Sequence, residues 1–142
     1  MAVKVKRVYE HPAKSDGSRV LVDRLWPRGL KKEAAALDWW LRDLAPSDEL
    51  RQWFHAYPTA WGVFRHRYVK DLVQPEALAA LEMLYELLRK GKVVTLLYAS
   101  RNQEHNNAVA LKELLEGRRK PPTGSGGASA QTQRSRSMRR LK

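Results

Sequence analysis

The sequence contains no cysteine, which excludes disulfide bonds, thiol nucleophiles and cysteine-ligated zinc. It has no run of 18 apolar residues that could cross a bilayer. Charged residues interrupt the first positions, Met1 to Lys6, where a secretory signal peptide requires an apolar segment. We therefore expect a cytoplasmic protein with no membrane partner.

Several motifs with defined chemistry are also missing. The four histidines show neither HExxH nor i, i+4 spacing, so we expect no metal site and no cofactor. No GxGxxG or GxxxxGK[ST] motif is present, which argues against a standard dinucleotide fold or a P-loop. Without a GxSxG motif, serine hydrolase chemistry has no support either.

Positive charge is abundant but unevenly distributed. The net charge is +12, yet residues 1–117 hold 19 basic against 15 acidic residues, whereas residues 118–142 hold eight basic and no acidic ones. The latter segment is rich in Pro, Gly and Ser and has too little apolar surface to offset the entropy of ordering. We predict one folded domain, residues 1–117, followed by a disordered basic tail, residues 118–142.

Alternating and Val-rich segments predict the strands. Residues 3–9 alternate apolar and charged side chains, as in a strand near a sheet edge, while residues 19–24 and 93–99 are short aliphatic runs typical of central strands. Helical spacing between and after these runs predicts helices at residues 31–43, 48–54, from Pro58 onward, 75–89 and 106–116. A helical crossover between central strands indicates a small three-layer α/β domain with a short, mostly parallel sheet flanked by helices.

Polar side chains follow both central strands. In open α/β sheets, ligands bind in the crevice beyond the carboxyl ends of the strands, so these side chains form a candidate ligand site. Guanidinium groups suit phosphate or carboxylate, and we expect Arg28 and Arg101 to hold an anion. The candidate ligand-binding residues are Asp23, Arg24, Trp26, Arg28, Ser100, Arg101 and Asn106.

Structural alternatives remain open for several of these residues. Asp23 and Arg24 could form an ion pair that closes the end of the sheet, and Trp26 could plug the sheet or stack on a ring. Asn106 or Asn107 could cap the last helix. If the protein is an enzyme, Glu104 and His105 are the candidate general acid/base pair, because imidazole titrates near neutrality.

Three separated motifs resemble the DUF488 family, particularly its YeaO-like branch: Asp23-Arg24-Leu25-Trp26-Pro27-Arg28-Gly29, Leu44-Ala45-Pro46-Ser47, and Thr95 to Arg101 followed by Glu104-His105-Asn106. The resemblance covers residues 3–117 and implies a compact α/β domain of uncharacterised activity, so it assigns no catalytic residue. We expect such a protein to bind, and if it is an enzyme to process, an anionic nucleotide-like or phosphorylated small molecule.

The alternative function is that of a nucleic-acid-binding accessory protein. Arginines on a flexible tail bind phosphates non-specifically, and a basic helix face would add to that surface. The tail could equally be a solubilising extension, and the helix face an ordinary solvated one. The residues of this predicted surface are Arg65, Arg67 and Lys70 on the helix and Arg134, Arg136, Arg139 and Arg140 in the tail.

Overall fold

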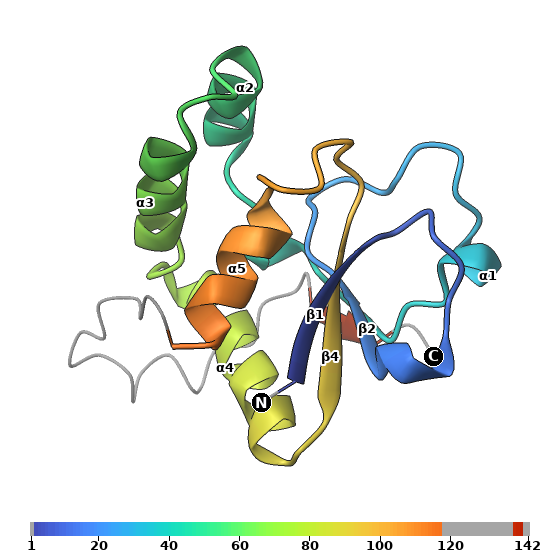
Figure 1. Cartoon of the computed structure of the whole chain (residues 1–142). Coiled ribbons are helices and arrows are strands. Elements are labelled where there is room, and N and C mark those ends of the chain that lie inside the picture. Colours follow the sequence, from blue (N-terminus) through green and yellow to red (C-terminus); the bar gives the residue numbers. More distant parts are fainter. Residues whose placement is uncertain (1, 118–137, 141–142) are drawn as a thin grey trace.

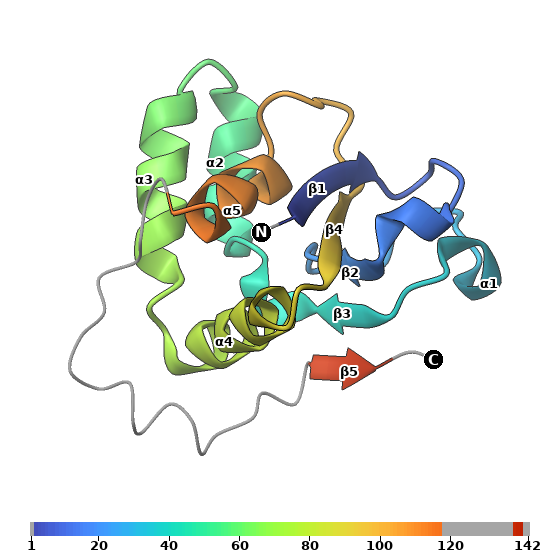
Figure 2. The same cartoon turned by 60° about the horizontal axis from the view of Figure 1, so that its bottom comes forward.

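The structure, a computed structural model, describes residues 2–117 and the strand at 138–140. Its sheet has the strand order β1-β4-β2-β3-β5, in which the first four strands are parallel and β5 is antiparallel to β3 (Figure 2). This arrangement confirms the predicted small α/β domain with a mostly parallel sheet. The strands are β1 (Ala2–Arg7), β2 (Ser18–Leu21), β3 (Trp39–Leu41), β4 (Val93–Tyr98) and β5 (Met138–Arg140).

Four helices lie on one side of the sheet: α2 (Asp48–Ala56), α3 (Trp61–Asp71), α4 (Pro75–Arg89) and α5 (Asn107–Leu115). Helices α4 and α5 pack on the strands, α3 packs on α5, and α2 packs on α3. The opposite face carries a smaller apolar cluster covered by residues 26–37, which include the short helix α1 (Lys32–Ala35). Two 3-10 turns, η1 (Lys14–Asp16) and η2 (Arg42–Leu44), complete the regular elements of the described residues. Figure 1 shows α1 far from the other helices, on the other side of the strands.

Strand β4 shows why the Val-rich segments become central strands. Val94, Leu96 and Tyr98 belong to the large core beneath the helices, whereas Leu97 belongs to the smaller cluster on the other face. Successive side chains of a strand point to opposite faces, so a strand covered on both faces is apolar over most of its length. The predicted placements of β1 at an edge and of β2 and β4 in the interior are therefore confirmed.

Local capping fixes where the helices begin. Ser47 Oγ accepts a hydrogen bond from the Leu50 amide (3.1 Å) at the start of α2. Pro75 occupies the first turn of α4, where its missing N–H costs nothing. Asn106 Oδ1 accepts from the Val109 amide (3.0 Å) and begins α5.

The prediction of a helix at residues 31–43 is wrong over most of that segment. Only α1 forms, and Ala36 ends it in the left-handed conformation (φ 48°). Trp39–Leu41 instead form β3, which pairs with β2 through Val20 opposite Trp39 and Leu21 opposite Trp40. The free edge of β2 offers backbone partners to an aromatic segment with high strand propensity, and this pairing overrides the helical spacing of the side chains.

The last strand, β5, lies within the segment that the sequence predicts to be a disordered tail. Met138–Arg140 form β5, with Leu41 opposite Met138 and Trp39 opposite Arg140. This strand contains Arg139 and Arg140, two members of the predicted nucleic-acid surface. Arg134 and Arg136 lie outside the described residues. The boundary between domain and tail after residue 117 stays a prediction.

Candidate functional site

Three loops follow the parallel strands β1, β2 and β4: residues 8–13, 22–31 and 99–106. We call them the carboxyl-end loops. Because β1 and β2 both pair with β4 in parallel, all three loops leave the same edge of the sheet. Figure 1 shows the loops after β2 and β4 on the same side of the strands. The predicted candidate residues from the two sequence segments therefore belong to one edge.

Asp23 connects the loop after β2 to the loop after β4 and to α5. Its Oδ2 accepts a hydrogen bond from the Ala99 amide (2.9 Å), and its Oδ1 accepts from Asn107 Nδ2 (3.2 Å). The same Asn107 amide nitrogen donates to the Val22 carbonyl (2.9 Å). Burial raises the pKa of Asp23 above its ordinary value, although the hydrogen bonds from Ala99 and Asn107 and the charge of Arg51 oppose this effect.

The end of β1 joins the other two loops. Arg7 Nε donates to the carbonyls of Ala99 (3.2 Å) and Ser100 (3.1 Å), and its guanidinium lies over the Tyr9 ring, 4.7 Å from the centroid. Tyr9 Oη donates to the Arg28 carbonyl (2.8 Å). Both contacts use backbone acceptors, so the loops that carry Arg28 and Arg101 are held without using either guanidinium group.

Trp26 has a structural position between the loop after β2 and strand β3. Its ring packs edge-to-face on Trp40 (centroids 5.4 Å apart), and its indole N–H donates to the Leu30 carbonyl (2.7 Å). The Trp40 indole in turn donates to the Asp23 carbonyl (2.8 Å). Trp26 is half-buried in the smaller apolar cluster, as expected for the plug that the sequence analysis names as one alternative.

Side chains of the loop after β4 form hydrogen bonds with the backbone of the same loop. Ser100 Oγ accepts from the Asn102 amide (3.1 Å), and Asn102 Oδ1 accepts from the amides of Glu104 (3.1 Å) and His105 (2.9 Å). Asn106 is buried, and besides capping α5 it donates from Nδ2 to the Asn102 carbonyl (2.9 Å). Ser100 and Asn106 therefore shape the loop, and Asn106 has the capping position that the sequence allows.

Glu104 and His105 are neighbours in sequence with different surroundings. Glu104 is exposed, whereas the His105 ring stacks on Trp61 of α3 with centroids 4.6 Å apart and an interplanar angle of 13°. This stack attaches the loop to the helical layer. A proton transfer between the two side chains has no support from a hydrogen bond among the described contacts.

Three arginines of the carboxyl-end loops have head groups that the scaffold does not use. Arg28 and Arg101 are exposed, Arg24 is half-buried, and none forms an ion pair with any residue that the structure describes. In particular, Arg24 Nε is buried and finds no hydrogen-bond partner within residues 2–117. Asp23 and Arg24 do not form the ion pair that the sequence leaves open.

The predicted basic helix face is divided between two contacts. Arg65 pairs with Glu113 of α5 (3.2 Å) and lies over the Trp61 ring, whereas Arg67 lies over the Trp53 ring of α2, 5.0 Å from its centroid. Residues two apart on a helix are about 200° apart around its axis, so these side chains leave α3 on different sides. Lys70 is exposed.

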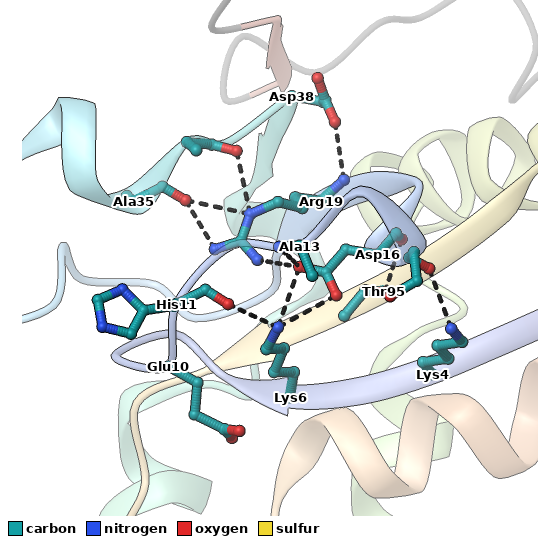
Figure 3. A network of polar contacts seen from close by, with 12 residues as sticks. Lys4, Lys6, Glu10, His11, Ala13, Asp16, Arg19, Ala35, Asp38 and Thr95 are labelled. Atoms are coloured by element: carbon teal, nitrogen blue, oxygen red, sulfur yellow. Dashed lines mark hydrogen bonds and ion pairs between the residues drawn. The ribbon is translucent and has the colours of Figure 1, made fainter.

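A second polar cluster lies on the α1 side of the sheet and is fully paired (Figure 3). The buried Asp16 carboxylate accepts from Arg19 Nη1 (2.6 Å), from Lys6 Nζ (3.2 Å) and from the Ala13 amide (3.0 Å). Arg19 also donates to the carbonyls of Ala35 (2.8 Å) and Ala36 (3.1 Å) at the end of α1. Every charge here has its partner, so this cluster stabilises the fold.

Within the described part of the chain, no group of three or more potential metal-ligating side chains comes together. Nor does any described helix have the length and apolar composition needed to cross a membrane.

Arg7 and Tyr9 belong to the site region, but they are not among the candidate residues predicted from the sequence. A usable signal exists for Arg7, since it is a charged residue near the end of a predicted strand, as the selected Arg24 is. The Asp23–Asn107 contact joins residues 84 positions apart, and no spacing rule points to it.

Comparison with known proteins shows the family to which this chain belongs. A family model described as the inactive DUF488-N3 subclade matches residues 2–132. The chain belongs to the DUF488 family. This DUF488 protein is 42% identical over 115 residues to the uncharacterized protein YeaO of Escherichia coli (strain K12), covering 81% of this chain and 97% of the relative.

Two further relatives are mycobacterial. The DUF488 chain is 42% identical over 116 residues to the uncharacterized proteins Mb3100c of Mycobacterium bovis and Rv3073c of Mycobacterium tuberculosis, covering 82% of this chain and 95% of each relative. No solved structure matches the chain. The predicted resemblance to the DUF488 family and its YeaO-like branch is therefore confirmed.

Proposed function

We propose that this protein binds a small anionic molecule, phosphorylated or nucleotide-like, at its carboxyl-end loops. The observation that carries the proposal is the buried Nε of Arg24, which has no hydrogen-bond partner among residues 2–117. A buried donor without a partner is costly, and an oxygen of a bound anion would satisfy it. Arg28 and Arg101 supply two further guanidinium groups from the same edge of the sheet.

Binding without turnover fits this DUF488 protein better than catalysis. The matching family model describes its subclade as inactive. His105 is stacked on Trp61, and the Asp23 carboxylate already accepts hydrogen bonds from Ala99 and Asn107. Two of the side chains that could move protons, His105 and Asp23, are therefore engaged in holding loops, while the arginines that could hold an anion are not.

The test is calorimetric titration of the full chain with inorganic phosphate and nucleoside monophosphates at low salt. Arg24→Ala, Arg28→Ala and Arg101→Ala should each weaken binding about tenfold or more, because each removes a charge-assisted hydrogen bond. The matched control is Arg89→Ala, which removes an exposed arginine at the end of α4, where the chain turns back toward the amino end of β4. Equal affinities in all four variants, or no binding by the wild-type chain, would refute the proposal.

A further inference from the structure

Asp23 is the acidic side chain that ties the carboxyl-end loops together, and its acceptor capacity is only half used. Each carboxylate oxygen accepts one hydrogen bond, from Asn107 Nδ2 and from the Ala99 amide. An ionised carboxylate offers about four acceptor positions. Asp23 is half-buried, and it forms no ion pair with another described residue. The Asp23 carboxylate can therefore accept further hydrogen bonds from a ligand.

The free acceptor positions of Asp23 and the unpartnered donor of Arg24 belong to residues that are neighbours in the sequence. Asp23 directly precedes Arg24, whose buried Nε lacks an acceptor within the described residues. Its hydrogen bond to the Ala99 amide also brings the carboxylate to the loop that carries Arg101. A ligand that contacts both the arginines and Asp23 must offer oxygen acceptors to the guanidinium groups and one O–H donor to the carboxylate.

We propose that Asp23 selects the anion by accepting a hydrogen bond from a protonated ligand oxygen. This inference rests on the proposed anion-binding function and specifies its ligand class. The site would take oxyanions that keep a proton near neutral pH, such as inorganic phosphate, and would take phosphate monoesters, whose second pKa is about 6, only in their singly protonated form. It would reject oxyanions of the same size and shape that carry no proton, because these present only acceptors to a carboxylate.

The surroundings of Asp23 favour such a contact. Burial raises its pKa, so the protein stabilises the carboxylate less completely than water does, and an added donor supplies what is missing. The charged and titratable groups coupled to it are Arg51 of α2, which favours the ionised carboxylate, and the buried hydroxyl of Tyr68 of α3. Burial raises the pKa of Tyr68 far above its ordinary value, and Tyr68 stays neutral.

Two matched pairs of oxyanions test the inference without changing the protein. Near pH 7, phosphate and arsenate retain a proton, whereas sulfate and selenate have none, and each pair is close in size. Calorimetric titration of the full chain at constant ionic strength should show phosphate and arsenate binding about tenfold or more tightly than sulfate and selenate, respectively.

Variants then assign the preference to Asp23. Asp23→Asn should bring the affinities for phosphate and sulfate to within about threefold, since the amide supplies donors to a proton-free anion. The control, Asp71→Asn, makes the same exchange at an exposed position at the end of α3, and it should keep the preference. Circular dichroism and the melting temperature verify that both variants fold.

The outcomes separate this inference from the proposed function. Equal binding of all four oxyanions would overturn selection by Asp23 and leave anion binding intact. Selectivity that persists in folded Asp23→Asn would also overturn it. No binding of any oxyanion would overturn both. The anion pairs decide the question even if Asp23→Asn fails to fold, because a wild-type chain without a preference for protonated anions is incompatible with the inference.

Discussion

Replacing Asp16 with asparagine should destabilise the protein more than any conservative exchange on its surface. The side chains of Asp16 and Arg19 are only 6% and 5% exposed, and their oxygen and nitrogen atoms are 2.6 Å apart. The variant removes the negative charge that compensates Arg19 and Lys6. Its amide nitrogen would also face one of the donors that the carboxylate now accepts.

Breaking a buried ion pair by removing one partner typically costs about 3–5 kcal/mol. The lower value applies here, because Arg19 keeps its hydrogen bonds to the carbonyls of Ala35 and Ala36. For a domain of this size, about 3 kcal/mol corresponds to a fall of roughly 10 °C in melting temperature. Asp71→Asn, the same exchange at an exposed position of α3, should change the melting temperature by about 2 °C or less.

The pH dependence of this difference tests its electrostatic origin. Hydrogen bonds from Ala13, Lys6 and Arg19 outweigh the effect of burial and lower the pKa of Asp16. The stability that the carboxylate contributes is therefore complete above its unfolded-state pKa of about 4 and is lost as the pH falls through its lower folded-state value. Differential scanning calorimetry should show wild type and Asp16→Asn converging in acid. A gap below about 1 kcal/mol at neutral pH would refute the reasoning.

Three further predictions concern the helices and the tail. Tyr68→Phe leaves the buried Leu44 carbonyl without its donor and should cost about 1–2 kcal/mol in urea denaturation, whereas Tyr57→Phe at an exposed position should cost nothing measurable. Ser47→Ala removes the cap of α2 and should cost about 1 kcal/mol by the same assay, with the exposed Ser15→Ala as control. Truncation after Gly117 removes eight positive charges and the three residues of β5, and it should leave the domain folded while abolishing low-salt binding to DNA in a mobility-shift assay. Tight DNA binding by the truncated domain, or its unfolding, would contradict this expectation.

Elements fixed by local chemistry could be predicted from the sequence. The Val-rich segments of β2 and β4 must be buried on both faces, and Ser47 followed by two acidic residues is a strong helix start. Strand β3 could not be predicted, because Trp39–Leu41 lie in a segment with good helical spacing and acquire their conformation from pairing with β2. Such pairing depends on tertiary context, which overrides local propensity.

The sequence could predict only where the candidate site lies, at the carboxyl ends of the parallel strands. Parallel strands bring their carboxyl ends together, and this rule placed Asp23, Arg28 and Arg101 in neighbouring loops. The rule does not say which side chains hold the loops and which are left over. That distinction depends on side-chain directions, as in the contacts from Asp23 to Ala99 and Asn107, and it becomes visible only in the folded structure.

Two sets of arginines among the described residues have opposite expected phenotypes. The Arg19 guanidinium is buried and forms hydrogen bonds with Asp16 and with the end of α1. Its removal should therefore lower the stability of the fold, and it should have no direct effect on ligand affinity. The Arg28 and Arg101 head groups make no ion pair within the described residues, and their loops are held through the backbone by Tyr9 and Arg7. Removing these two head groups should therefore leave stability almost unchanged and affect binding alone. A binding defect without a stability defect is what separates a ligand site from a structural cluster.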